Sequence, residues 1–444
     1  MLPRFIFCLW LLSVSTVTLA EERPPHPPQK TSVRSGDYWE VVYPPSEKPG
    51  ELVFGVTYTL WIPQGTEKLH GVIVHQHGCG GGACKGGATA AFDLHWQALA
   101  AKWNCALLGP SYHQEDMQNC RLWCDPRNGS EQTFLRSLTE IGEAAQRPEL
   151  KEVPWCLWGH SGGGFWGSLM QVKYPQRVIA VWLRSGTAFS AWEKGEIPKP
   201  EIPADVYGVP TVANPGAKEN GDKRFSGAWD GGLAMFKAYR AKDALFAFIP
   251  DPRSAHECGD SRYMAIPFFD ACLEQRLPTQ GQQLRPMKQE TAWLATVHSD
   301  VARPAASYQG EKLEAMWLPN ERVAKVFSEY VRTGFVEDQT PPPAPTNVQV
   351  KADGGGNVIT WEATADFESG ISSFEIERNG KKIGQVPEKP VGKFGRPLFQ
   401  VMSYHDTPEK PLPEMRFIDA NPGKTKEPHD YRVITVNASG VKSK

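Results

Sequence analysis

The chain has 444 residues, of which 40% are hydrophobic and 22% charged, and its formal net charge is −2. This length is enough for two domains, and the composition is that of an ordinary globular protein. The near-neutral charge excludes the strongly basic surface on which nucleic-acid binding depends. After the first twenty residues, no stretch approaches the ~20 apolar residues of a membrane span.

The first twenty residues have the pattern of a secretory signal. Arg4 precedes an apolar run at residues 5–12, and small residues follow up to Ala20. This is the order of charge, apolar segment and cleavage site in export signals. We therefore expect a secreted protein, extracellular or periplasmic. Residues 21–36 are proline-rich and polar, and we expect them to form a flexible leader.

Residues 37–337 alternate between strand and helix patterns. An antiparallel hairpin over residues 37–63 comes first, and residues 277–309 are weakly patterned and are predicted to be irregular. Strands are expected at residues 71–78, 106–110, 155–158, 178–183, 209–213 and 245–249. Helices are expected at residues 92–103, 131–145, from 163 onward, 231–241, 262–274 and 320–333, the last with Asn320 as its cap. The pattern predicts an α/β fold with a mostly parallel sheet flanked by helices.

A second domain is predicted after the proline-rich linker at residues 338–345. Residues 346–444 contain short strand patterns, typical of a small all-β sandwich. Trp361 and the closing strand from Tyr431 resemble a fibronectin type III module, although a long proline-rich insertion at residues 386–417 departs from it. We expect this domain to bind a polysaccharide or another surface.

One segment carries a specific catalytic pattern. Gly159-His160-Ser161-Gly162-Gly163 fits G-x-S-x-G and lies between an apolar strand pattern and a helix pattern. A serine at such a strand-to-helix turn projects its hydroxyl from the edge of the sheet, and the glycines allow the close backbone approach. Ser161 is therefore the candidate nucleophile. The backbone N–H groups of Gly162 and of Cys79, in the glycine-rich His77-Gly78-Cys79 loop, are candidate oxyanion donors.

These motifs resemble the α/β-hydrolase superfamily over roughly residues 50–275. The His77-Gly78-Cys79 loop, the export signal and the appended β domain are similar to secreted polyester depolymerases and feruloyl or acetyl-xylan esterases. The resemblance implies a catalytic histidine in the loop after the last strand, which is His256. His298 is the weaker alternative.

The resemblance also implies an acid after the preceding strand. Glu219 has the expected spacing after a glycine, Asp222 is the alternative acid, and Asp230 is a distant third. A carboxylate is needed there because it holds the histidine in the tautomer that accepts the proton of the serine.

Nine cysteines are present, and Cys8 lies in the signal. Cys105 and Cys156 lie in strand patterns and are expected to be buried free thiols. The other six are placed in or beside loops: Cys79, Cys84, Cys120, Cys124, Cys258 and Cys272. We expect Cys79 or Cys84 to form a disulfide with Cys120 or Cys124, because these loops should meet at the edge of the sheet beside the nucleophile. Cys120-x-x-x-Cys124 resembles half a zinc site but lacks a matching Cys/His pair, so no metal is expected.

The sequence thus predicts a secreted serine hydrolase that cleaves carboxylic esters, small or polymeric, through an acyl-enzyme and without a cofactor. Two alternatives stay open. One is a serine peptidase of the same fold, and the other is an inactive adhesion or carbohydrate-binding protein.

Overall fold

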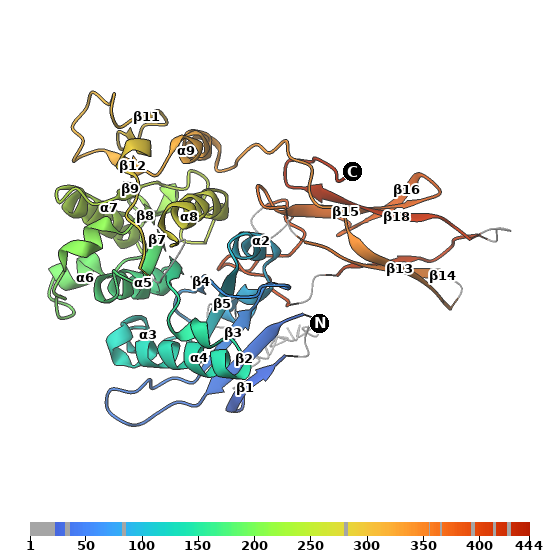
Figure 1. Cartoon of the computed structure of the whole chain (residues 1–444), viewed down its shortest axis with the longest axis horizontal. Helices are drawn as coiled ribbons and strands as arrows, with labels where there is room; N and C mark the ends of the chain where they lie inside the picture. The colour runs from blue at the N-terminus through green and yellow to red at the C-terminus, as the bar shows by residue number, and fades with distance from the viewer. Residues whose placement is uncertain are drawn as a thin grey trace, which may run out of the picture.

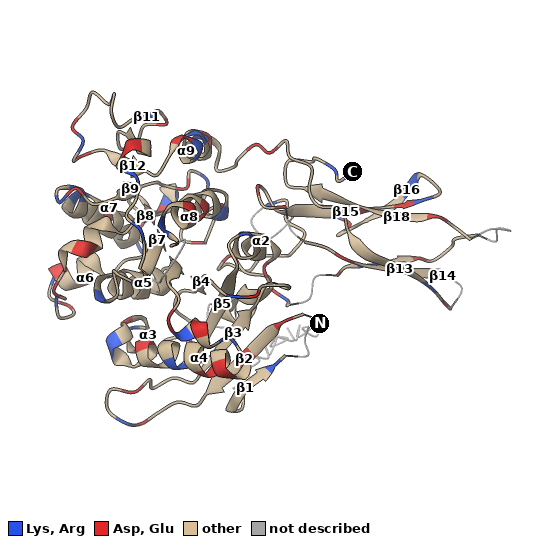
Figure 2. Cartoon of the chain, in the orientation of Figure 1, with Lys and Arg blue, Asp and Glu red and all other residues tan. Residues whose placement is uncertain are grey.

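The computed structural model describes residues 23–31, 36–81, 86–278, 283–354, 356–364, 366–391, 396–411, 414–423 and 428–444. The expected signal at residues 1–20 lies outside these ranges, as does Cys84. The chain forms a larger α/β body and a smaller body of strands (Figure 1). Acidic and basic residues are interspersed along the backbone of both bodies (Figure 2). Among the described residues, no helix has the length and apolar character that crossing a membrane demands.

A nine-stranded sheet, counted over the described residues, forms the centre of the α/β body. Its order is β1-β2-β3-β5-β4-β6-β7-β8-β9, with antiparallel pairs from β1 to β5 and parallel pairs from β5 to β9. The strands are β1 (His26–Lys30), β2 (Tyr38–Tyr43), β3 (Val56–Trp61), β4 (Gly71–Gln76), β5 (Cys105–Tyr112), β6 (Trp155–His160), β7 (Val178–Arg184), β8 (Thr211–Asn214) and β9 (Phe246–Phe248). Every residue of β4 to β9 is buried, which explains their continuous apolar runs.

Helices cover both sides of this sheet, as the alternating pattern predicts. They are α2 (Leu94–Lys102), α3 (Arg121–Cys124), α4 (Ser130–Ala144), α5 (Gly162–Lys173), α6 (Phe189–Glu193), α7 (Ser226–Arg240), α8 (Arg262–Arg276) and α9 (Glu321–Thr333). Strands β4 and β5 lie between α2 and α4 (Figure 1). Helix α5 packs on β6 and β7, directly behind Ser161. The predicted cap of α9 is confirmed, because the Asn320 side chain accepts a hydrogen bond from the Val323 amide.

Three expectations differ from the structure. Residues 26–30, predicted as part of a flexible leader, form β1 and pair with β2 at the edge of the sheet, where prolines are tolerated. Residues 277–309 were predicted to be irregular, yet they contribute two strands to a small antiparallel sheet of β10 (Trp293–Ala295), β11 (Ala302–Pro304) and β12 (Met316–Leu318). A strand of three residues is too short to show the alternation of apolar and polar residues by which strands are predicted. Cys272, placed in or beside a loop, lies inside α8.

The described residues within 346–444 form two three-stranded antiparallel sheets, which we call the β unit. Its strands are β13 (Thr346–Asp353), β14 (Gly356–Glu362), β15 (Ile371–Arg378), β16 (Lys381–Val386), β17 (Arg416–Asp419) and β18 (Tyr431–Asn437). Asn379 and Gly380 join β15 to β16 with φ of 51° and 74°, the backbone of a tight hairpin turn. The core of this unit includes Trp361 and Phe374, and Leu94 of α2 packs into the same cluster. The likeness to a fibronectin type III module stays a prediction.

The long insertion of the β unit folds back onto the α/β body. We call its described residues 396–411 the docking segment. The Gln400 side chain accepts a hydrogen bond from the Leu94 amide and donates one to the Phe92 carbonyl, both at 2.9 Å. Arg262, fully buried, donates to Asp93 at 2.7 Å and to Asp406 at 3.1 Å. A void of about 10 Å³, the space of one water molecule, is lined by residues of both bodies, among them Asp93, Arg262 and Gln400.

Candidate active site

The backbone around Ser161 has the strain expected of a nucleophile turn. Ser161 joins β6 to α5 with φ of 52° and ψ of −113°, a conformation that non-glycine residues rarely adopt. A Cβ atom on Gly159 would lie 2.2 Å from the Gly163 carbonyl oxygen, and one on Gly163 would lie 2.3 Å from the Gln76 oxygen. Both flanking glycines are therefore required by contact with neighbouring backbone.

Three of the predicted side chains form one hydrogen-bonded chain. His256 Nε2 lies 3.0 Å from Ser161 Oγ, and His256 Nδ1 lies 2.5 Å from Glu219 Oε1. Glu219 follows β8 and is fully buried, while His256 lies in the loop after β9. These segments are far apart in the sequence but meet because the carboxyl ends of β6, β8 and β9 share one edge of the sheet.

The second oxygen of Glu219 is also held. Glu219 Oε2 accepts hydrogen bonds from Ser185 Oγ at 2.9 Å and from the Gly216 amide at 2.8 Å. Two donors and His256 thus satisfy this buried carboxylate and fix its orientation. Sequence reasoning did not single out Ser185, although its position directly after β7 is a usable signal.

The other candidates for the acid and the base, Asp222, Asp230 and His298, are not part of this hydrogen-bonded chain. Asp222 is exposed and accepts hydrogen bonds from the Phe225 amide at 2.7 Å and the Arg224 amide at 2.8 Å, which lower its pKa. It therefore caps a turn. Asp230 is exposed on α7. His298 stacks on Trp229, with ring centroids 6.1 Å apart.

The predicted oxyanion residues are neighbours. A Cβ atom on Gly162 would lie 2.4 Å from Cys79 Sγ, and one on Gly78 would lie 3.0 Å from Ser161 Cβ. The loop of Cys79 is tied down by a disulfide to Cys120, which confirms the expectation of a disulfide between these loops. Cys124 is a buried free thiol, as are Cys105, Cys156, Cys258 and Cys272.

Arg184, at the end of β7, holds the loop that carries His256. Its buried guanidinium donates to Ser254 Oγ at 2.8 Å, to the Ala255 carbonyl at 3.0 Å and to the Asn214 carbonyl at 2.8 Å. Burial lowers the pKa of Arg184, but the nearby Asp251 and Glu219 carboxylates more than offset this and raise it. The guanidinium therefore stays charged. Sequence reasoning did not single out Arg184, because most of its partners are backbone groups of distant segments.

Two further residues frame His256. Phe225 stacks on its ring, with centroids 3.9 Å apart and planes within 7°. His160, the residue before the nucleophile, lies 2.5 Å from the His256 carbonyl oxygen through Nε2 and 3.0 Å from His405 Nδ1 through Nδ1. Burial and the neighbouring His405 and His256 place the pKa of His160 well below its usual range, so its ring is neutral. His405 lies 245 residues away in the chain, so no local pattern could reveal it.

Three side chains beside this site bring together nitrogen and sulfur atoms, which are atom types that can hold a metal ion. His160, His405 and Cys258 bring nitrogen and sulfur atoms within 4.8 Å of one another, and all three are buried. The 3.0 Å separation of the two Nδ1 atoms is also that of an ordinary hydrogen bond. Another group, Cys79 with Cys120 and Cys124, contains the disulfide.

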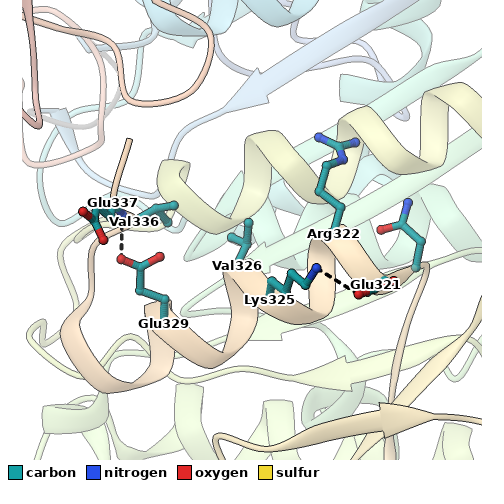
Figure 3. A pocket seen from close by; sticks show the side chains of 8 residues that line it. Glu321, Arg322, Lys325, Val326, Glu329, Val336 and Glu337 are labelled. Carbon is teal, nitrogen blue, oxygen red and sulfur yellow. Dashed lines mark hydrogen bonds and ion pairs between the residues drawn. The ribbon is translucent and has the colours of Figure 1, made fainter. Parts of the chain in front are cut away.

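A hollow of about 580 Å³ lies elsewhere, on the outer face of α9 (Figure 3). Charged side chains that line it already have partners, since Lys325 contacts Glu321 at 2.9 Å, Arg322 pairs with Asp270, and Glu329 accepts a hydrogen bond from the Glu337 amide at 2.6 Å. None of the residues around Ser161 lines it. We therefore place the candidate active site at Ser161.

The architecture is that of the α/β-hydrolase fold, a mostly parallel sheet with a nucleophile turn after a central strand. Several solved structures are similar to parts of the chain. A ferulic acid esterase is 16% identical with a TM-score of 0.37, covering 54% of this chain and 96% of that chain. An S-formylglutathione hydrolase from Agrobacterium tumefaciens is 13% identical with a TM-score of 0.36, covering 56% and 96%.

A thermostable esterase is 12% identical with a TM-score of 0.34, and the match covers 48% of this chain and only 54% of that chain. No protein-family model matches the sequence. No curated protein matches it either. Similarities this low do not transfer an activity or a substrate.

Proposed function

We propose that the protein is a secreted serine hydrolase that cleaves carboxylic esters through an acyl-enzyme. The hydrogen-bonded chain from Glu219 through His256 to Ser161, on a strained strand-to-helix turn, is the observation that supports this. A serine hydroxyl is a weak nucleophile until a base takes its proton, and His256 is within reach of that proton.

The proposed reaction has two halves. In the first, Ser161 Oγ attacks the ester carbonyl carbon while His256 Nε2 takes the hydroxyl proton, and Glu219 stabilises the resulting imidazolium. The amides of Cys79 and Gly162 bind the oxyanion, and His256 returns the proton to the departing alcohol. In the second half, water replaces the alcohol, attacks the acyl-enzyme with His256 as base, and releases the acid.

The proposed substrates are carboxylic esters, including polymeric or carbohydrate-linked ones. The His77-Gly78-Cys79 loop and its resemblance to esterase motifs support this choice over peptide bonds. The proposal of export rests on the pattern of residues 1–20, and the Cys79–Cys120 disulfide is consistent with an oxidising compartment. The role of the β unit in binding a polysaccharide or surface remains a proposal of the same kind.

The test uses the purified mature protein. A fluorophosphonate probe should label Ser161 stoichiometrically, and the Ser161→Ala variant should stay folded and unlabelled with turnover lower by roughly a thousandfold or more. Hydrolysis is then compared on short-chain acyl esters, acetylated xylan, feruloyl esters, polyhydroxybutyrate and peptide amides. Absence of labelling would favour the inactive binding protein, and cleavage of peptide amides alone would favour the peptidase.

A further inference from the structure

The ring of His160 lies where three parts of the candidate site meet. Its Nε2 contacts the backbone carbonyl of His256 at 2.5 Å, and its Nδ1 contacts His405 Nδ1 at 3.0 Å. A Cβ atom on Gly78, in the loop of the proposed oxyanion donor, would lie 3.1 Å from the same Nδ1. A rotation of this ring would therefore disturb both the loop of the base and the oxyanion loop.

The hydrogen bonds determine the tautomers. A carbonyl oxygen only accepts, so His160 Nε2 must carry a hydrogen and donate it to the His256 carbonyl. His160 is neutral because burial disfavours its charged form, so its Nδ1 carries no hydrogen and must accept. The donor in the remaining bond is therefore His405 Nδ1.

His405 is held on both sides by the docking segment. The carbonyl of Tyr404 accepts a hydrogen bond from the Cys258 amide at 3.1 Å, which ties this segment to the loop of His256. On the other side, Asp406 pairs with the buried Arg262, and Thr407 Oγ1 donates to the Gly86 carbonyl at 3.0 Å. The β unit thus presents the His405 donor from a fixed position.

We propose that His405 of the β unit is a positioning residue of the active site, acting through His160 on the backbone of His256. This inference rests on the proposed function. The β unit would then be part of the catalytic apparatus as well as the proposed binding module. Because His405 touches no reacting atom, its loss should lower kcat by misplacing His256 and should leave KM little changed.

Two substitutions separate the hydrogen bond from the bulk of the ring. His405→Phe keeps a ring but has no donor, and we expect kcat to fall roughly 10- to 100-fold with KM within about threefold of the wild type. His405→Asn can place an amide N–H near the position of Nδ1, and we expect it to recover most of the loss. Equal kcat for the Phe variant and the wild type, or no recovery in the Asn variant, would overturn the proposal.

A matched control changes the same interface without touching His160. Gln400→Leu removes the two hydrogen bonds to residues 92–94 and should lower the melting temperature while leaving kcat near the wild-type value. If Gln400→Leu lowers kcat as much as His405→Phe, the fall in kcat comes from weaker contact between the docking segment and the α/β body, and the proposal fails.

Two measurements on the wild-type protein need no turnover. Nitrogen-15 NMR of labelled histidine should show neutral His160 with its hydrogen on Nε2 and His405 with a hydrogen on Nδ1; the reverse tautomer of His160 would overturn the hydrogen-bond chain. Metal analysis should find no stoichiometric ion. If the wild type contains stoichiometric zinc and the His405→Phe variant does not, His160 and His405 bind a metal ion and the proposed hydrogen bond between them is wrong. If the wild type does not react with the fluorophosphonate probe, the proposed function fails, and these measurements still decide the hydrogen-bond chain.

Discussion

At the scale of single residues, the choice of acid depends on which carboxylate has an oxygen in contact with His256. Glu219 presents one oxygen to His256, while Ser185 and Gly216 bind the other. Asp222, three residues further, uses its carboxylate to cap the turn that carries Phe225. Both carboxylates are therefore occupied, but only Glu219 contacts the histidine directly.

We expect Glu219→Gln to lower kcat by up to roughly 10⁴-fold, because the amide favours the wrong histidine tautomer. Asp222→Asn keeps an oxygen that can accept the Phe225 amide, so its kcat should stay within about threefold of the wild type. Steady-state kinetics on one chromogenic ester, with melting temperatures as a folding control, distinguish the two variants. The opposite ranking would assign the role to Asp222.

At the scale of elements, the turn from β6 to α5 shows how a strand and a helix present one hydroxyl. Gly163 and Gly167 lie one turn apart on α5 but have different surroundings. A Cβ atom on Gly163 would lie 2.3 Å from a backbone oxygen, whereas one on Gly167 would have its nearest neighbour, a Leu183 methyl, at 3.8 Å.

Gly163→Ala should therefore lower kcat at least 100-fold and reduce the melting temperature, because backbone must move to admit the methyl group. Gly167→Ala should preserve activity and stabilise the protein by up to about 1 kcal/mol, since alanine is the better helix former. Kinetics and urea unfolding of both variants check this. Full activity in Gly163→Ala would show that the turn accommodates a methyl group at this position, contrary to the close contact with the Gln76 oxygen.

The Cys79–Cys120 disulfide joins two loops at the same edge and closes 41 residues of chain. Replacing both cysteines by serine should lower the free energy of unfolding by up to about 4 kcal/mol, as expected for a loop of this length. It should also lower kcat, because the proposed oxyanion amide of Cys79 loses its anchor. Cys124→Ser, which changes a neighbouring buried free thiol, is the control and should keep the disulfide. If kcat is unchanged in the double variant, the disulfide is not needed to position the proposed oxyanion amide of Cys79.

At the scale of the whole molecule, the linker to the β unit is held by side-chain hydrogen bonds as well as by chain connectivity. Asp338, at the start of the predicted linker, accepts hydrogen bonds from Asn437 at 2.7 Å and from Ser369 at 2.8 Å. Asp366 lies against it, and burial together with a hydrogen bond to Asp338 raises the pKa of Asp366 to about 8. The two carboxyl groups thus share a proton at neutral pH.

This shared proton makes stability depend on pH. Between about pH 4 and pH 8 the folded protein keeps the Asp366 proton that the unfolded chain has lost, so the free energy of unfolding should fall as pH rises through this range. Asp366→Asn resembles the protonated acid, so it should abolish this part of the decline and be more stable than the wild type above pH 8. Thermal melts from pH 4.5 to 8.5 measure the difference. Parallel curves for the two proteins would contradict the shared proton.

The sequence by itself determined the features that depend on local contacts. Strand and helix alternation predicted the α/β fold, because each element must bury its apolar face, and G-x-S-x-G placed Ser161 because steric crowding at that turn selects glycine. Chain order and resemblance then pointed to His256 and Glu219, which the structure brings into one hydrogen-bonded chain. Their catalytic roles await the tests above.

Only the tertiary structure decided which distant groups share a buried space. Arg184 was missed because most of its partners are backbone carbonyl groups of distant segments, those of Asn214 at the end of β8 and of Ala255 in the loop after β9, and any residue type supplies a carbonyl. His405 was hidden because the insertion that carries it has no periodicity and docks on an α/β body hundreds of residues earlier in the chain. Burial decides such contacts, because a buried polar group must find a partner wherever the fold places one, and sequence spacing carries no record of that choice.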